Sequence, residues 1–309
     1  MEHRPLGNTG LTVAPVALGT GSIGEMFGPV TLQEAVNVVH AAIDLGVNLI
    51  DTSVYYGSAE ERLGVALNGR REKVILSTKA GRYGFGEFDF SPARIRASLE
   101  QSLTRMKTDY VDIFQLHDVE FVPLGPVLGE GFATIQKLKD EGKCRFVGMS
   151  GYPIHTIERV MRETDVDVVL TYAKATLLDG SLADRIIPVA AEEGVGVINA
   201  AAVAVGLLTP GGTAFGNDHP ASSAIINSAL AMRTLAAERG VDISFIANQY
   251  SMWRSGASTT VIGTSKIKNL CSAITACSEP LVSELEAAFL ALRPSPADRQ
   301  WKSGLPENN

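Results

Sequence analysis

The chain has 309 residues, of which 45% are hydrophobic and 20% are charged, and it carries a net charge of -7. This length and composition can bury the core of one barrel-sized domain or of two smaller ones, which excludes a disordered chain. The negative balance provides no general basic field for nucleic acid or an anionic membrane, so we expect a small-molecule partner and neither of those two.

Short apolar runs rich in β-branched residues alternate with helical patterns along the whole chain. Thr31 to Glu34 and Ser58 to Glu61 both have the pattern of a capping box, and Ser91 with Pro92 is typical of an N-cap followed by proline. In chain order, we expect strands at residues 16–20, 49–53, 74–79, 111–117, 145–150, 168–172, 196–201 and 259–264. This alternation predicts parallel strands joined by crossover helices.

The number and spacing of these units indicate the fold. Eight strand–helix units in 309 residues, with no linker or shift in composition, predict an α/β fold: a single (β/α)8 TIM barrel that spans residues 1–309. Residues 3–14 resemble a small β-hairpin that closes the barrel floor. Residues 207–222 and the tail exceed the usual loop length, and the tail at 295–309 is expected either over the active site or loose at the surface.

A glycine-rich stretch follows the first expected strand. "GTGSIG", from Gly19 to Gly24, formally matches the dinucleotide pattern G-x-G-x-x-G. The next helix is expected only from Thr31, however, and the acidic residue at the required distance, Asp44, falls within that helix. We therefore favour a first strand–helix loop that lets a ligand approach the barrel mouth over a Rossmann turn.

Four polar residues stand at the ends of successive strands. Asp51, Lys79 and His117 close the second, third and fourth strands, and Tyr56 lies in the loop after Asp51. Taken singly they have ordinary explanations as a turn cap, a solvated strand end, a core histidine and a rim aromatic. Because the carboxyl ends of barrel strands meet at one mouth, we expect the four side chains to lie within contact distance.

Such a group can exchange a proton with a substrate. A tyrosine has a reference pKa of about 10, but an ammonium about 4 Å away favours the phenolate by about 4 kcal/mol at an effective dielectric near 20. Lys79 can supply that charge, Asp51 can keep it ionised, and a neutral His117 can bind the substrate oxygen. We expect Tyr56 to be a general acid/base with a pKa near the working pH, and hydride chemistry then implies a nicotinamide cofactor.

A possible anion site follows the last strand. Gly263, Thr264 and Ser265 lead into a helix start, with Lys266 beside them. Barrel enzymes often hold phosphate at this position on backbone amides, although the same residues also suit an ordinary N-cap.

The motifs "DTSVYYG", "ILSTKAGRY", "VDIFQLHD", "GMSGYP", "GLLTPGG" and "VIGTS" resemble, in order and spacing, those of the aldo-keto reductases from Arg4 to Ala287. The resemblance implies a barrel that binds NAD(P)H in extended form, with a catalytic tetrad of Asp51, Tyr56 as proton donor, Lys79 and His117. It also implies cofactor contacts at Gly19, Thr20, Asp51, Ser150, Gly151, Tyr172, Gly206, Leu207, Thr209, Gly263, Thr264, Ser265, Lys266 and Asn269. Ser150 would bind the carboxamide, residues 206–209 the pyrophosphate and residues 263–265 the adenosine end.

Within the family, "FGPV", "LHDVEF" and "HPAS" resemble the sugar-oxidising branch, the aldose 1-dehydrogenases of L-galactose and L-fucose. Members of that branch oxidise the anomeric hydroxyl to a lactone with NAD, and Tyr56 would then act as the base. The alternatives are an NAD-dependent pyridoxal dehydrogenase, a general aldehyde or ketone reductase, and a non-enzymatic cofactor-binding regulatory subunit. Expected substrate contacts are Tyr55, Tyr56, Phe85, Phe88, His117 and Trp301.

Several positions depart from the family pattern. Gly151 replaces an asparagine, Tyr172 a glutamine, and Ala200 stands near the tyrosine that usually stacks on nicotinamide. Asn269 falls where NADP-preferring members often have arginine, which favours NAD, while Lys266 and Lys268 keep NADP open.

The cysteines bear on the compartment. Cys144, Cys271 and Cys277 have an odd count and no metal-binding spacing, and the first residues lack the pattern of a signal peptide. We therefore expect a cytoplasmic protein without a metal. Nothing in the sequence indicates an oligomeric state.

Overall fold

The computed structural model describes residues 1–212, 219–279 and 281–309. Eight parallel strands close into a barrel in the order β10-β3-β4-β5-β6-β7-β8-β9, with β10 paired to both β9 and β3. Their bounds are Val16–Gly19 (β3), Leu49–Asp51 (β4), Ile75–Ala80 (β5), Val111–Leu116 (β6), Cys144–Gly151 (β7), Val168–Tyr172 (β8), Gly196–Ala200 (β9) and Thr259–Gly263 (β10). All eight expected strands are present, and the predicted TIM barrel is confirmed.

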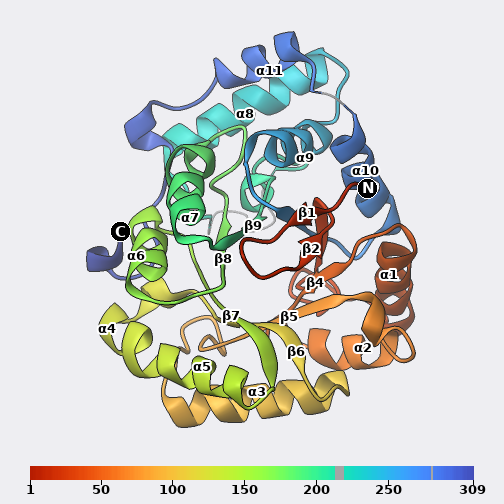
Figure 1. The fold of residues 1–309 in the computed structure, drawn as a ribbon. Helices are drawn as coiled ribbons and strands as arrows, with labels where there is room; N and C mark the ends of the chain where they lie inside the picture. The colour runs from red at the N-terminus through yellow and green to blue at the C-terminus, as the bar shows by residue number, and fades with distance from the viewer. Residues whose placement is uncertain (213–218, 280) are drawn as a thin grey trace.

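Helices surround the barrel (Figure 1). They are Leu32–Asp44 (α1), Ala59–Ala66 (α2), Pro92–Met106 (α3), Leu124–Pro126 (α4), Phe132–Asp140 (α5), Ile154–Glu163 (α6), Ile187–Glu193 (α7), Ser223–Glu238 (α8), Ile243–Arg254 (α9), Ile267–Ser278 (α10) and Ser283–Leu290 (α11). None of the described helices is long and apolar enough to cross a membrane.

The N-terminal hairpin closes one end of the barrel. Strands β1 (Arg4–Pro5) and β2 (Thr12–Val13) pair antiparallel. Leu6, between them, is fully buried and packs in one cluster with interior residues such as Ile75 and Ile198 at the amino ends of the strands. The Asn8 amide also donates to the Gly194 carbonyl just before β9, at 2.9 Å. The hairpin therefore forms the barrel floor, as expected, and leaves the carboxyl ends of the strands for a site.

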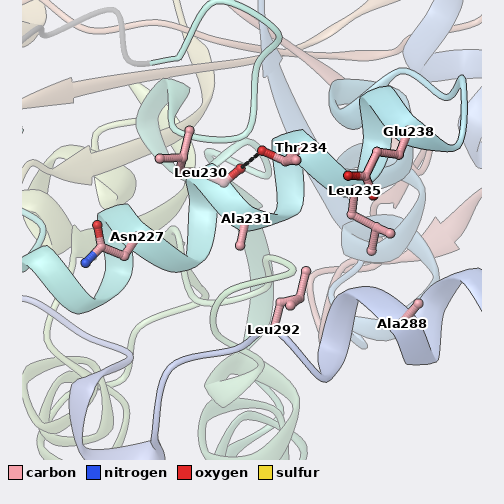
Figure 2. Close-up of a pocket in the computed structure, with 8 residues that line it drawn as sticks. All are labelled: Asn227, Leu230, Ala231, Thr234, Leu235, Glu238, Ala288 and Leu292. Atoms are coloured by element: carbon pink, nitrogen blue, oxygen red, sulfur yellow. Dashed lines mark hydrogen bonds between the residues drawn. The ribbon is translucent and has the colours of Figure 1, made fainter.

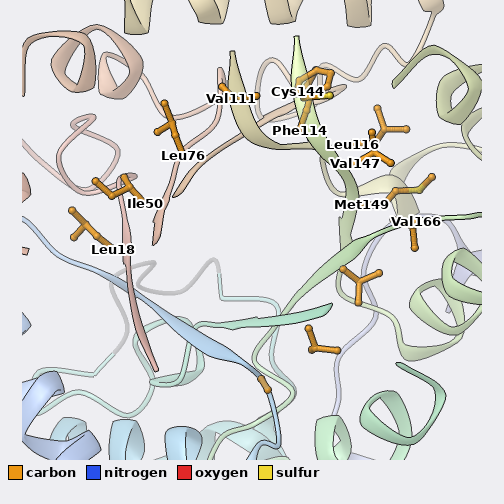
Figure 3. Close-up of a cluster of buried hydrophobic side chains, with 14 of the residues drawn as sticks. Leu18, Ile50, Leu76, Val111, Phe114, Leu116, Cys144, Val147, Met149 and Val166 are labelled. Carbon is orange, nitrogen blue, oxygen red and sulfur yellow. The ribbon is translucent and has the colours of Figure 1, made fainter. Parts of the chain in front are cut away.

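A second apolar layer joins the strands to the helices. Outward-facing strand residues such as Leu18, Ile50 and Phe114 are fully buried against the helices (Figure 3). A separate cluster fills the space beneath α8, α9 and α11 and includes Ile225 and Phe289. These layers fix the strands, so the polar residues at their ends have defined positions.

The helix starts agree only partly with expectation. The capping box of Thr31 and Glu34 is complete, and α3 begins at Pro92 after Ser91. The capping box expected at Ser58 and Glu61 is wrong, because the Ser58 hydroxyl donates to Glu25 in the preceding loop at 3.2 Å and makes no cap bond. A tertiary partner has replaced the local one.

Candidate active site

Asp51 and Lys79 form a buried ion pair on adjacent strands. Asp51 is the last residue of β4, and Lys79 stands next to the end of β5. The ammonium donates to Asp51 Oδ2 at 2.5 Å and to the carbonyl of Thr52 at 2.9 Å, and the side chains of the pair are almost fully buried. Burial lowers the pKa of Lys79, but the charges of Asp51 and Tyr56 outweigh it and the net shift is upward, so the amine stays charged.

Asp51 is held by three neighbouring strands. Ser77 donates to Asp51 Oδ1 at 3.0 Å, and Gln115 donates to the Ser77 hydroxyl at 2.8 Å. The hydroxyl and amide of Thr20, after β3, both donate to the Asp51 carbonyl, at 3.0 and 3.1 Å. These bonds fix the direction from which the carboxylate meets Lys79.

Tyr56 lies above this pair, in the loop between β4 and α2. Lys79 Nζ is 5.0 Å from the centre of its ring. The ring of His117, just after β6, lies 5.6 Å away and nearly perpendicular, at 86°. The structure thus brings together the four side chains that the sequence places far apart.

The electrostatics of Tyr56 differ from expectation. Burial raises the pKa of Tyr56 to about 12, and the Lys79 charge opposes that rise without cancelling it. The expected pKa near the working pH is therefore wrong for this structure, because desolvation exceeds the attraction of the ammonium. The phenol is protonated at neutral pH, as a proton donor must be.

His117 is neutral, as expected. Burial lowers its pKa to about 3, although the nearby carboxylate of Asp118 acts in the opposite direction. Nδ1 lies 3.0 Å from the hydroxyl of Ser53, and Nε2 lies 3.6 Å from Asp118 Oδ2. The ring is therefore hydrogen-bonded at Nδ1, whereas Nε2 faces the Asp118 carboxylate without a hydrogen bond to it.

Arg82, Asp118 and Tyr55 form a polar wall beside Tyr56 and His117. Arg82 Nη1 donates to Asp118 Oδ2 at 2.5 Å, and Nη2 donates to the Tyr55 hydroxyl at 3.3 Å. The guanidinium also lies 4.2 Å from the centre of the Tyr55 ring, which is 6.1 Å from each of the rings of Tyr56 and His117. Neither Arg82 nor Asp118 was among the substrate contacts expected from the sequence. Both residues could have been predicted at the site, because they follow Lys79 and His117 closely in the sequence.

The expected aromatic walls are placed unequally. Phe85 is 91% exposed, so the expectation that it lines the site is wrong in this structure. Phe88 stacks on Phe121 with ring centres 4.7 Å apart, near Arg82. Trp301 stacks on Tyr152, just after β7, at 4.5 Å.

The C-terminal tail is anchored rather than loose. Asn308 donates to the carbonyls of Glu120 and Val122 at 2.8 and 2.9 Å, and Ser303 donates to Glu120 Oε1 at 3.0 Å. The chain end therefore lies beside α6 (Figure 1) and across the loop that follows β6. This position puts Trp301 near the mouth, and its contact with substrate stays a prediction.

The positions expected to hold the nicotinamide carboxamide lie on β7 and β8. Ser150 is fully buried, and its hydroxyl accepts the Asp118 amide at 3.1 Å. A side chain at Gly151 would require Glu120 to shift, because a Cβ would lie 2.9 Å from Glu120 Oε2. Tyr172, at the end of β8, pairs in register with Ala200 on β9, and its ring lies 5.2 Å from that of Tyr152.

The backbone after β9, where the pyrophosphate contacts were expected, is locally strained. It takes positive φ at Ala201, Ala204, Val205 and Gly206, of which only the last is a glycine. Left-handed backbone at non-glycine residues is strained and is concentrated at ligand-binding segments. The Thr209 hydroxyl closes the turn by bonding the Gly206 carbonyl at 2.8 Å, and buried Leu207 lies between them. The long loop expected at residues 207–222 includes residues 213–218, which lie outside the described residues.

The β10 end adjoins this segment. Gly263 is exposed and pairs in register with Gly19 of β3. A Cβ added at Gly19 would lie 2.7 Å from the side chain of Val261.

The start of α10 follows this strand end. The Thr264 hydroxyl accepts the Lys266 amide at 3.0 Å, and α10 starts at the next residue. Ser265, Lys268 and Asn269 surround this helix start, so amides and cations are available to an anionic group. Together with the strained turn after β9, the residues fit a nicotinamide dinucleotide.

Other hollows lie apart from this group. An apolar groove between α8 and α11, lined by Leu230, Leu235 and Leu292 among others, contains none of the strand-end residues (Figure 2). Within the described ranges, no group of three or more His, Cys, Asp or Glu side chains could hold a metal ion.

Residues 15–290 match the aldo/keto reductase family. The chain is 38% identical over its whole length to the L-galactose dehydrogenase of Arabidopsis thaliana, 99% of which is covered. The chain belongs to the aldo/keto reductase family.

One further relative agrees with that assignment, and a solved structure shares the fold. The D-arabinose 1-dehydrogenase of Saccharomyces cerevisiae is 30% identical, with 84% of this chain and 81% of the yeast protein covered. The holo form of an aldo-keto reductase from Bacillus halodurans shares the fold, with a TM-score of 0.78 at 24% identity over 100% of this chain and 99% of that one. Family membership implies an oxidoreductase that uses NAD(P)H. When bound, the cofactor would supply the hydride in its reduced form or accept it in its oxidised form.

Proposed function

We propose that this aldo/keto reductase oxidises the anomeric hydroxyl of an aldose, of the L-galactose or L-fucose type, to a lactone, with NAD preferred over NADP. Two relatives named for sugar oxidation, the L-galactose and D-arabinose dehydrogenases, support the substrate class. We also propose that the catalytic roles fall on Asp51, Tyr56, Lys79 and His117, and that the protein works in the cytoplasm.

The observation that carries the substrate class is the buried pair of Arg82 and Asp118. Both side chains are less than a fifth exposed. Asp118 faces His117, and Arg82 lies over the ring of Tyr55, which neighbours the rings of Tyr56 and His117. An apolar aldehyde would displace water from these charged groups and offer no hydrogen bonds in its place, and burial of polar groups without hydrogen bonds is unfavourable. A sugar offers hydroxyls on neighbouring carbons that donate to Asp118 and accept from Arg82.

The side chains then divide the work. His117 holds the anomeric oxygen, and Tyr56 accepts its proton as the C1–H bond breaks. Lys79 lies close enough to stabilise the phenolate that must exist for this step, and Asp51 holds the lysine in place. Because burial raises the pKa of Tyr56, we expect oxidation to be faster at alkaline pH.

The preference for NAD rests on Asn269. It lies in the first turn of α10 and is exposed, and an asparagine lacks the forked guanidinium that binds a 2′-phosphate. Lys266 and Lys268 beside it are the residues through which NADP would be accepted.

The test is a substrate panel. We expect formation of reduced cofactor from NAD with L-galactose or L-fucose, less with D-galactose, and less again when NADP replaces NAD. Turnover of pyridoxal alone would leave the family and the catalytic group in place and replace the sugar with a pyridine aldehyde. Cofactor binding with no turnover of any alcohol or aldehyde would favour a regulatory subunit.

A further inference from the structure

Ser53 lies within the catalytic group and has no role in the steps above. It sits two residues after Asp51, and its side chain is fully buried. Its hydroxyl oxygen lies 3.0 Å from His117 Nδ1 and accepts the backbone N–H of Tyr55 at 3.1 Å. The hydroxyl therefore connects the loop that carries both tyrosines to the histidine.

The direction of the hydrogen bond follows from the number of protons. A serine hydroxyl has one hydrogen to donate and two lone pairs that accept. One lone pair takes the Tyr55 N–H, and in the described part of the chain His117 Nδ1 is the one acceptor within reach of the hydrogen. A proton on Nδ1 would leave the buried serine hydrogen without an acceptor, a situation that folded proteins rarely tolerate.

The other edge of the ring agrees with this direction. His117 Nε2 faces Asp118 Oδ2, which already accepts from Arg82. A carboxylate attracts an N–H and repels a lone pair, so the proton belongs on Nε2. The separation of 3.6 Å is too long for a hydrogen bond, and this N–H is therefore free to bind a ligand.

We propose that Ser53 is a positioning residue that fixes neutral His117 in the tautomer with its proton on Nε2, so that the ring donates to the substrate oxygen beside Tyr56. The Nε2–H group of His117 holds the substrate oxygen by a hydrogen bond while the proton of that oxygen moves to or from Tyr56. His117 itself neither gains nor loses a proton. The identity of the oxygen rests on the proposed function, whereas the tautomer does not.

The tautomer can be observed directly. We would label the histidines of the full-length protein with ¹⁵N and record long-range ¹H–¹⁵N spectra at neutral pH, assigning His117 by its absence in His117→Gln. We expect the shift of an unprotonated nitrogen at Nδ1 and of a protonated one at Nε2. A protonated Nδ1 in the unaltered protein would overturn the proposal.

Variants at Ser53 separate positioning from packing. In Ser53→Ala we expect His117 to sample both tautomers and kcat to fall about tenfold while KM changes little. Ser53→Thr keeps the hydroxyl and should keep both the spectrum and most of kcat. Ser102→Ala is the matched control, because that buried serine donates to Ser98 within α3, far from the site in sequence and role, and its loss should leave kcat unchanged.

Failure of this proposal and failure of the proposed function look different. An Ala variant with an unchanged His117 spectrum and unchanged kcat would remove Ser53 from the mechanism, whatever the substrate. A substrate panel without an active sugar would instead replace the substrate and leave the spectrum intact. If Ser53→Ala does not fold, the spectrum of the unaltered protein and the kcat of Ser53→Thr still decide the question.

Discussion

The carboxyl group of Glu120 occupies the space in which a side chain at Gly151 would lie, because a Cβ there would approach Glu120 Oε2 to 2.9 Å. The other oxygen of Glu120 accepts the Tyr152 amide at 3.1 Å and the Ser303 hydroxyl at 3.0 Å. Glu120 therefore fills the position of the usual asparagine and at the same time anchors the C-terminal tail.

Gly151→Ala should destabilise the protein. The added methyl group meets a buried carboxyl that is already bonded on its other oxygen, and overpacking of this kind costs about 1–3 kcal/mol. Denaturant unfolding measures the change. Gly129→Ala is the control, since no heavy atom outside its own helix lies within 4 Å of a Cβ there, and it should be neutral or stabilising. Equal stability of the two variants would contradict the packing described here.

Glu120→Gln should change how stability depends on pH. Burial, followed by the charge of Asp118, raises the pKa of Glu120 to about 8 from 4.5. Between these two pKa values the folded protein keeps a proton on Glu120 that the unfolded chain releases. The contribution of Glu120 to the free energy of unfolding is therefore fully present below about pH 4.5 and is lost as the pH rises through 8. Relative to the unaltered protein, the Gln variant should gain in Tm between pH 5 and pH 8. A constant difference in Tm across that range would refute the assignment.

Lys79→Met should move the alkaline limb of the pH profile. The ammonium lowers the pKa of Tyr56 against the effect of burial, so its loss raises that pKa further and slows sugar oxidation at neutral pH. The variant also leaves Asp51 unpaired, which costs about 3–5 kcal/mol. The pair Lys79→Met with Asp51→Asn restores neutrality and serves as the control for folding. If the limb stays in place in a folded variant, Lys79 does not act on Tyr56.

Arg82→Met should reduce activity on sugars selectively. Removal of the guanidinium takes away a partner of the sugar hydroxyls and of Asp118, and a charged hydrogen bond contributes about 1.5–3 kcal/mol. We expect kcat/KM for the active sugar to fall by about ten- to a hundredfold, with a smaller loss in the reduction of a short aldehyde. Arg94→Met is the matched control, because that arginine also stacks on a tyrosine, Tyr83, at 4.1 Å but makes no contact with the catalytic group. Equal losses on both substrates would argue against a sugar subsite.

The strands and the convergence of their ends could be predicted from sequence. Short apolar runs between helical patterns predict the strands, and in a barrel the carboxyl ends of all strands meet at one mouth. The convergence of Asp51, Lys79 and His117 therefore needed no long-range information. The motifs of the family then supplied the expected cofactor contacts.

The parts that escaped prediction depend on tertiary placement. Asp118 takes a left-handed backbone conformation, which turns its carboxylate toward His117 and Arg82, and no local pattern indicates it. The depth of burial of Tyr56 decides its pKa, and depth is a property of the folded chain. Phe85 was expected at the site because it lies in the loop that follows Lys79, and the course of that loop, which leaves the ring in solvent, is a property of the folded chain.

The central claim is that Tyr56 exchanges the proton with substrate, and Tyr56→Phe tests it most directly. The measurement is kcat with the best sugar of the panel, together with a fluorescence titration of NADH. We predict unchanged binding of NADH and a loss of about 10²- to 10⁴-fold in kcat, because the ring stays beside Lys79 and His117 while the exchangeable proton is gone. Near-normal turnover by a folded Phe variant would contradict the account.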